Sequence, residues 1–225
     1  MAVYQVYPNR KKKYFGFLEN LSLTMKLILI NIFCFILFSI LISTGIIGID
    51  SIAIKPENIL QGKYIWTFLT SMFMHGSFFH IFANMLSLYF IGTLIERILG
   101  RKRYLTFYLL AGLFAGLFFV FSSFVFPQDL SAYAVGASGA LFGIAGLMVI
   151  LTPNLPLSVM FIPIPIKAKY AIPGLLLLLW VISITANVGI GNTAHLGGLL
   201  FGLVYGIILR NKFPNKIKYI SRHFS

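Results

Sequence analysis

The chain has 225 residues and a net charge of +13; 59% of the residues are hydrophobic and only 10% are charged. A soluble domain carries about 25% charged residues, and a disordered chain needs low hydrophobicity, so both classes are excluded. A single cysteine, Cys34, and the lack of a glycine period or heptad exclude a disulfide scaffold, a collagen and a coiled coil. The composition predicts an all-α membrane protein.

Six hydrophobic segments follow one another along the chain, and we expect each to form a transmembrane helix. They cover residues 25–49, 80–99, 104–126, 137–152, 168–188 and 193–209. A helix needs about 20 residues to cross a hydrocarbon core of about 30 Å, and only the fourth segment is short. The sequence therefore predicts a six-helix domain at residues 24–212, with a basic segment at 1–23 and a basic tail at 213–225.

The basic residues fall in short clusters between the hydrophobic segments, as the positive-inside rule describes for cytoplasmic loops. With the N-terminus inside, only two of the 18 Lys and Arg residues, Lys55 and Lys63, lie outside. We therefore expect both termini in the cytoplasm of a multi-pass protein, and the short basic N-terminus is typical of a prokaryotic inner-membrane protein. Nucleic acid is excluded as a partner, because such a protein gathers its basic residues on one soluble face.

Residues 64–79, in the loop between the first two segments, contain no Asp, Glu, Lys or Arg. This stretch is too short to cross the membrane and too apolar for water. We expect it in the outer membrane interface, with Trp66 as an anchor. The alternative is a buried extracellular loop.

Strongly polar side chains occur near the outer ends of three predicted helices. Burying such groups in the membrane costs free energy, so their presence indicates a functional site. The second helix carries His80 and Asn84, the fourth Ser138 and the sixth His195. At 1.5 Å per residue, Asn84, Ser138 and His195 all lie about 20–22 Å from the basic inner edge. We therefore expect these groups to share one layer.

Serine and histidine in one layer predict a nucleophile and its general base. A serine hydroxyl is a weak nucleophile until a base such as histidine removes its proton. Ser138 lies at a helix start beside Gly136 and Gly139, whose small size admits a substrate backbone. Because no carboxylate lies at this depth, a hydrolase at this site would use a Ser138–His195 dyad.

The developing oxyanion of such a reaction needs hydrogen-bond donors. The Ser138 N–H in the first helical turn, Asn84 and His80 are the candidates. In the simpler alternative, Ser138 only bonds to a neighbouring helix. A zinc site of His75, His80 and His195 is less favoured, because no acid or thiolate lies near them.

Two further patterns concern the packing of the helices. Gly139 with Gly143, and Gly198 with Gly202, form small-residue faces that let helices approach closely. We expect the fourth and sixth helices to be in contact. Glu96 with Arg97, followed by Gly100, indicates an inner helix end with a local ion pair.

At these residues the sequence resembles the rhomboid family of intramembrane serine proteases, over about residues 66–206. HGSFFHIFANM is similar to the second helix of that family, and LIERILG to its Glu–Arg turn. GASGALFG resembles the nucleophile motif, and AHLGGLLFG resembles the general-base helix. The nucleophile and base motifs in this order are far more specific than a GxSG alone.

The resemblance implies that Ser138 is the nucleophile, His195 the base, and the Ser138 N–H, Asn84 and His80 the oxyanion donors. Phe142 stands where many members have a tyrosine that packs on the base, and Thr67 stands where an arginine would follow Trp66. The implied substrates are single-pass membrane proteins in the lipid bilayer, cut from the extracellular or periplasmic side without a cofactor. The alternatives are a non-catalytic family member that binds membrane helices and a transporter or proton channel.

Overall fold

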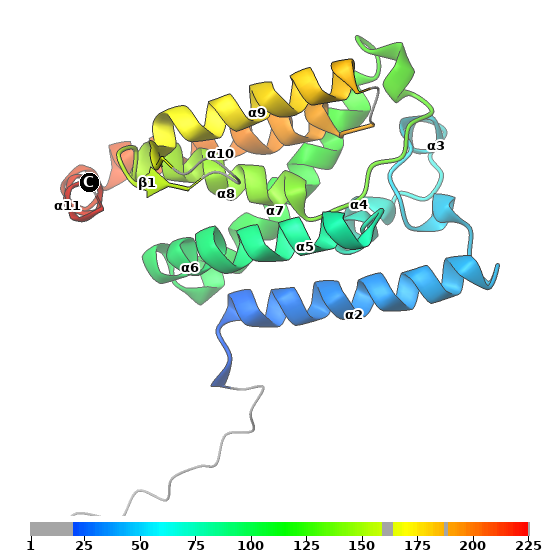
Figure 1. The fold of residues 1–225 in the computed structure, drawn as a ribbon, viewed down its shortest axis with the longest axis horizontal. Helices are drawn as coiled ribbons and strands as arrows, with labels where there is room; N and C mark the ends of the chain where they lie inside the picture. Colours follow the sequence, from blue (N-terminus) through cyan, green and yellow to red (C-terminus); the bar gives the residue numbers. More distant parts are fainter. Residues whose placement is uncertain (1–19, 159–163, 187–188, 225) are drawn as a thin grey trace, which may run out of the picture.

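The computed structural model describes residues 20–158, 164–186 and 189–224, and it is mostly helical (Figure 1). Within these residues, five helices are long and apolar enough to cross a membrane. They are Leu23–Ser43 (α2), Phe78–Leu99 (α5, η3 and α6), Arg101–Ser122 (α7), Ala168–Thr185 (α9) and Asn192–Lys212 (α10). The fourth predicted segment forms a shorter apolar helix, Ser138–Leu151 (α8). The predicted class, a helical membrane bundle, is confirmed.

Short elements connect these helices. Before α5 lie η1 (Ile49–Ser51), α3 (Pro56–Leu60), α4 (Thr67–Thr70) and η2 (Ser71–Phe73). A 3-10 turn, η4 (Pro127–Asp129), precedes α8, and the antiparallel strands β1 (Pro156–Leu157) and β2 (Ile166–Lys167) follow it. The long helix before α7 is α5 (Phe78–Ser87), the π-helical turn η3 (Leu88–Gly92) and α6 (Thr93–Leu99).

Two helices end earlier than the hydrophobic pattern predicts. The first helix ends at Ser43, and Gly45 then adopts a φ of +73°, a left-handed conformation typical of the residue after a helix C-terminus. The third helix ends at Ser122, where the Ser122 and Ser123 hydroxyls donate to the Phe119 and Val120 carbonyls. Hydrophobicity continues past both points, but the backbone does not remain helical.

The predicted basic C-terminal tail, residues 213–225, contains a helix, α11 (Pro214–His223). Its Ile217 is buried against the bundle, while the basic side chains of Lys216 and Lys218 are exposed. Most of the predicted N-terminal segment, residues 1–19, lies outside the described residues.

Helix α8 lies in the middle of the bundle and is buried along most of its length. It packs closely on α10, because a Cβ atom on Gly198 or Gly202 would overlap the Gly139 or Gly143 carbonyl oxygen. The predicted contact between these helices is confirmed. Backbones this close gain dispersion contacts, the main source of helix association in lipid.

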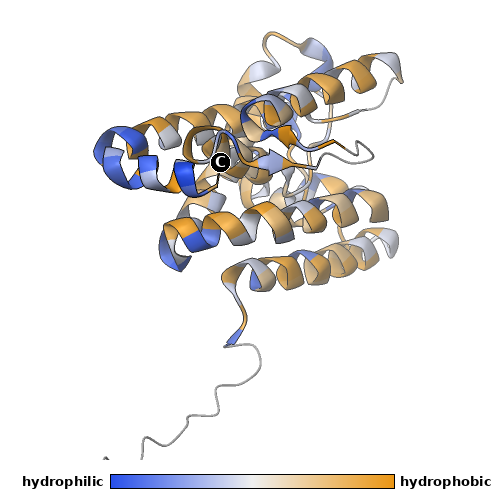
Figure 2. Cartoon of the chain, turned by 60° about the vertical axis from the view of Figure 1, so that its left-hand side comes forward, coloured by the Kyte–Doolittle hydropathy of each residue, from blue (hydrophilic) through white to orange (hydrophobic). Residues whose placement is uncertain are grey.

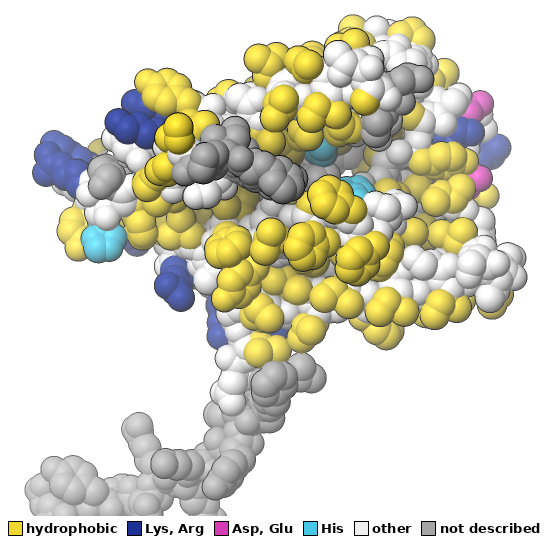
Figure 3. Space-filling view, in the orientation of Figure 1, with side chains coloured by type: hydrophobic (Ala, Val, Ile, Leu, Met, Phe, Trp, Pro, Cys, Tyr) yellow, Lys and Arg dark blue, Asp and Glu magenta, His cyan; other side chains and the backbone are white. Residues whose placement is uncertain are grey.

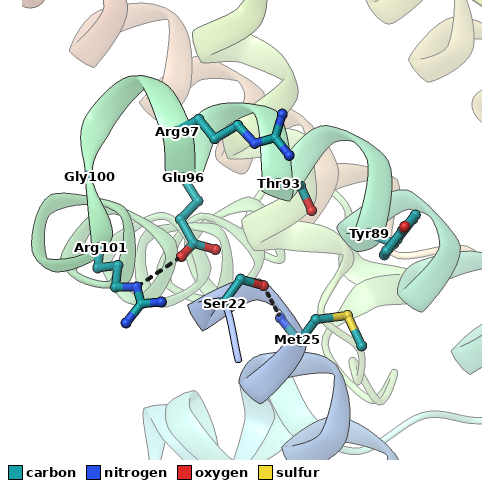
Figure 4. Close-up of a pocket in the computed structure, with 8 residues that line it drawn as sticks. All are labelled: Ser22, Met25, Tyr89, Thr93, Glu96, Arg97, Gly100 and Arg101. Carbon is teal, nitrogen blue, oxygen red and sulfur yellow. Dashed lines mark hydrogen bonds and ion pairs between the residues drawn. The ribbon is translucent and has the colours of Figure 1, made fainter. Parts of the chain in front are cut away.

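The carboxylate of Glu96 holds the start of α2 (Figure 4). Its oxygens accept from the Leu23 and Thr24 N–H groups, at 2.8 Å each, and from the Thr24 hydroxyl at 2.7 Å. The predicted local pair with Arg97 is wrong: the Arg101 Nε lies 3.6 Å from Glu96, whereas Arg97 extends towards Thr93. Gly100, with a φ of +79°, turns the chain between α6 and α7 and brings Arg101 back to Glu96.

The bundle has polar ends and an apolar belt. Figure 2 shows hydrophobic helix bodies with hydrophilic residues gathered at their ends. Large apolar side chains such as Phe33, Phe90 and Phe121 are exposed on the outside of the bundle. Figure 3 shows most of the Lys and Arg side chains of this face at the left-hand end, and the acidic side chains at the right-hand end together with a few basic ones.

Candidate active site

Ser138 is the first residue of α8 and follows a turn that requires glycine. Gly136 has a φ of +119°, and a Cβ atom there would lie 2.8 Å from the His80 Nε2 atom. An isolated antiparallel bridge between Ile54 and Ala134 ties the segment before this turn to the loop between α2 and α5. Ser138 therefore follows a turn that glycine adopts readily and other residues rarely do, next to a segment that the loop holds in position.

The side chains of Ser138 and His195 are in contact. The Ser138 Oγ lies 2.8 Å from the His195 Nε2, within hydrogen-bond distance. With the ring proton on Nδ1, the serine hydroxyl donates to Nε2, which is the arrangement that general-base catalysis needs. His195 is only 7% exposed, because the close packing of α8 on α10 covers it.

Phe142, one turn after Ser138, stacks on the His195 ring. The ring centroids are 4.6 Å apart and the planes are inclined by 24°. Phe142 is buried, and its face limits the rotation of the imidazole. The apolar Phe142 ring therefore holds the plane of the His195 ring without a hydrogen bond between the two side chains.

Each of the three predicted oxyanion donors has an N–H group that can still donate. The Gly76 N–H donates to the His80 Nδ1 at 3.4 Å, so in neutral His80 the proton is on Nε2, the atom that faces Gly136. The Asn84 amide donates one N–H to the His80 carbonyl at 3.0 Å, which leaves its second N–H to donate. The N–H of Ser138, as the first helical residue, has no acceptor within α8.

His75 is a residue of this region that the sequence analysis considered only as a metal ligand. It is fully buried, its Nε2 accepts from the Ala137 N–H at 3.4 Å, and its ring meets the His80 ring edge-on at 5.1 Å. His75 thus holds the residue before Ser138. A lone histidine in the apolar loop 64–79 was the available signal, but no periodicity linked it to Ala137.

Within the described residues, no acidic side chain is hydrogen-bonded to His195. Among the residues the structure describes, the buried His195 Nδ1 has no hydrogen-bond partner, and no group of three His, Cys, Asp or Glu could hold a metal ion. Asp129 accepts a hydrogen bond from the Thr193 hydroxyl at 3.2 Å, at the start of α10. Burial raises the pKa of Asp129, although the bond from Thr193 opposes this shift.

The loop between α2 and α5 is held in place although it has Thr67 where the sequence comparison expected an arginine. The Trp66 Nε1 donates to the Ser51 carbonyl at 3.0 Å, and Thr67 is fully buried beside it. The Trp66 and Ile65 side chains are both more than half exposed. Their place in the membrane interface stays a prediction.

Comparison with known proteins agrees with the motifs. A family model for the rhomboid domain matches residues 62–212. RHOMBOID-like protein 1 of Arabidopsis thaliana is 37% identical over 161 residues, which are 69% of this chain and 37% of the relative. RHOMBOID-like protein 2 of the same plant is 36% identical over 161 residues, which are 70% of this chain and 46% of the relative.

A bacterial relative is the rhomboid protease GluP of Bacillus subtilis (strain 168), which is 33% identical over 152 residues, 64% of this chain and 26% of the relative. The chain thus spans less than half the length of these three relatives. The apolar helices and the matched domain together establish a multi-pass membrane protein, and the chain belongs to the rhomboid family.

Proposed function

We propose that this chain is an intramembrane serine endopeptidase that cuts transmembrane segments with Ser138 as nucleophile and His195 as general base. The observation that carries the proposal is the 2.8 Å contact between Ser138 Oγ and His195 Nε2, made across two helices. If Ser138 only stabilised helix packing, any nearby hydrogen-bond acceptor, such as a backbone carbonyl, would be sufficient. Here the partner of Ser138 is a histidine, the residue type that most often serves as a general base near neutral pH.

In the first step, the Ser138 Oγ attacks the carbonyl carbon of the scissile peptide bond, and its proton moves to the His195 Nε2. The carbonyl oxygen becomes an oxyanion, and in this proposal the Ser138 N–H, His80 and Asn84 donate hydrogen bonds to it. The position of the His80 Nε2 beside Gly136 and the second N–H of Asn84 support these roles. The protonated His195 then gives its proton to the leaving amine, and the C–N bond breaks. This leaves an ester between Ser138 and the first fragment.

In the second step, His195 takes a proton from a water molecule, which attacks the ester carbonyl. The tetrahedral intermediate collapses, the Ser138 oxygen takes the proton back from His195, and the second fragment leaves with a new carboxylate. Water must therefore reach a site that lies between apolar helices. Figure 3 shows histidine side chains at the surface between the yellow side chains of this face, in support of such access.

We also propose that six helices span the membrane, with α8 as the short fourth span and both termini in the cytoplasm. The larger share of basic side chains at one end of the bundle supports this orientation. The dyad then lies in the half of the membrane nearer the opposite side, and the site opens to the extracellular or periplasmic face. By family likeness, the substrates are single-pass membrane proteins cut near the outer ends of their helices.

The rival function is that of a non-catalytic family member that binds membrane helices. Two of the similar proteins are named only as rhomboid-like, whereas the bacterial relative is named a protease. Binding alone requires neither an activated serine nor donors directed at its oxygen. The contact between the two side chains therefore favours catalysis.

The deciding experiment is labelling of the purified protein with a fluorophosphonate, which reacts only with activated serines. We expect the wild type to be labelled and both Ser138→Ala and His195→Ala to remain unlabelled. Ser87→Ala and His223→Ala are matched controls, because both residues lie outside this site, and should label like the wild type. An unlabelled wild type that melts cooperatively would refute the catalytic proposal in favour of the binding protein.

A further inference from the structure

A second site lies at the basic end of the bundle, in a groove between α7 and α10. The groove has a volume of about 240 Å³. Its rim is formed by Lys102, Arg103 and Thr106 on the first turns of α7. Its floor is apolar and aromatic, and includes Leu110, Phe201 and Tyr205.

The polar rim and the apolar floor lie at different depths. Lys102 and Leu110 are eight residues apart on α7, which corresponds to about 12 Å along the helix axis. A molecule that fills the groove must therefore present a polar group at the membrane surface and an apolar chain about 12 Å deeper. Phospholipids have this polarity, whereas soluble ions do not.

The rim also selects for negative charge. Lys102 and Arg103 are both exposed, and within the described part of the chain neither forms a salt bridge. No acidic residue lines the groove. By contrast, the pocket beside α2 is lined by Glu96, and its Arg101 is already paired with that carboxylate. The groove on α7 thus has unneutralised positive charge where a lipid phosphate would lie.

The floor is formed by aromatic rings that support one another. The Phe107 ring lies 5.7 Å from that of Phe201 and 5.0 Å from that of Tyr205, and the Phe114 ring lies 5.4 Å from that of Phe201. Such a wall loses little conformational entropy when a chain packs on it, because its rotamers are already fixed. Leu110, which is 49% exposed, forms the edge of this floor.

We propose that this groove binds one anionic phospholipid of the leaflet at the basic end of the bundle. The phosphate contacts Lys102 and Arg103, and one acyl chain lies along Leu110 and Phe201. The attraction between basic residues and an anionic headgroup supplies selectivity over zwitterionic lipid. The apolar floor supplies selectivity for lipid over free phosphate. This inference is independent of the proposed peptidase activity.

The test is titration of the purified full chain with phosphatidylglycerol or phosphatidylcholine, with the lipid-bound fraction measured by native mass spectrometry. Wild type should bind one phosphatidylglycerol more tightly than phosphatidylcholine. The double variant Lys102→Gln/Arg103→Gln should bind phosphatidylglycerol about 30-fold more weakly, the change expected when two basic residues near an anionic surface are removed. Lys216→Gln/Lys218→Gln removes the same charge from α11 at the exposed end of the chain and should bind like the wild type.

A second pair of variants tests the floor. Leu110→Ala should weaken phosphatidylglycerol binding severalfold, whereas Leu117→Ala, at a similarly exposed position of α7 outside the groove, should not. Inorganic phosphate at millimolar concentration should displace no lipid. Equal loss in both charge variants, equal binding of the two lipids, displacement by phosphate, or an unaffected Leu110→Ala would each overturn the proposal.

Discussion

Replacing Glu96 by alanine should detach the start of α2 from the rest of the bundle. Glu96 accepts three hydrogen bonds from Leu23 and Thr24 and lies near Arg101. Two of these bonds come from N–H groups in the first turn of α2, which have no partner within their own helix. The substitution removes all three bonds and leaves a cavity at a buried position.

The size of the effect follows from the number and kind of these bonds. A hydrogen bond to a charged group contributes about 1.5–3 kcal/mol, so three would contribute roughly 4–9 kcal/mol if they were fully buried. Water at the membrane edge can reach the freed N–H groups, and we therefore expect about 4 kcal/mol. For a protein of this size, 1 kcal/mol corresponds to about 2–4 °C in melting temperature, which gives a decrease of about 10 °C.

Thermal unfolding of the purified protein in one detergent measures this change. Thr24→Val removes the hydroxyl bond to Glu96 and a longer, 3.4 Å contact with the Tyr104 hydroxyl, and its melting temperature should fall between those of the wild type and Glu96→Ala. Glu57→Ala is the matched control, because it deletes a half-exposed acid whose one ion pair among the described residues is with Lys55, and it should melt within about 2 °C of the wild type. If Glu96→Ala also melts within 2 °C of the wild type, the carboxylate does not hold α2.

Three further changes test the site and its support. Gly136→Ala imposes a side chain on a φ of +119° and should reduce substrate cleavage about 100-fold through a displaced Ser138; near-normal cleavage would contradict this. Gly202→Ala should lower the free energy of unfolding by about 1–3 kcal/mol, whereas Gly174→Ala, which meets open space, should not; equal effects would exclude close packing as the cause. Burial raises the pKa of Asp129 above its ordinary 3.8, so the folded state binds the carboxyl proton more tightly than the unfolded state does. The free energy of unfolding therefore falls as the pH rises from 3.8 through the raised pKa of the folded state. Asp129→Asn should remove this decline in melting scans, and an unchanged pH profile would contradict it.

The membrane class could be predicted from the sequence because hydrophobicity is a local property. Segments of about 20 apolar residues need no tertiary information to be recognised. The helix ends at Ser43 and Ser122 could not be predicted in this way, because hydrophobic residues continue beyond both. A glycine conformation and serine hydroxyl bonds ended these helices, and neither affects hydropathy.

Partners of polar residues were harder to predict. The neighbouring Arg97 was the expected partner of Glu96, but the turn at Gly100 brings Arg101 and the start of α2 to the carboxylate instead. Similarly, His75 has no sequence pattern that connects it to Ala137, 62 residues later. Contacts of this kind depend on where the helices cross, and the crossing points cannot be read from the spacing of residues along the chain.

The sequence by itself determined the hydrophobic segments, the asymmetry of basic residues and the presence of Ser138 and His195 at a similar depth in two helices. These features follow from composition and from a fixed rise per residue. Only the tertiary structure decided that the two side chains meet at 2.8 Å, that Phe142 stacks on the histidine, and that α2 is held by Glu96. The physical reason is that depth fixes one coordinate of a side chain, whereas its rotation about the helix and its neighbours are fixed by close packing of glycine backbones between α8 and α10.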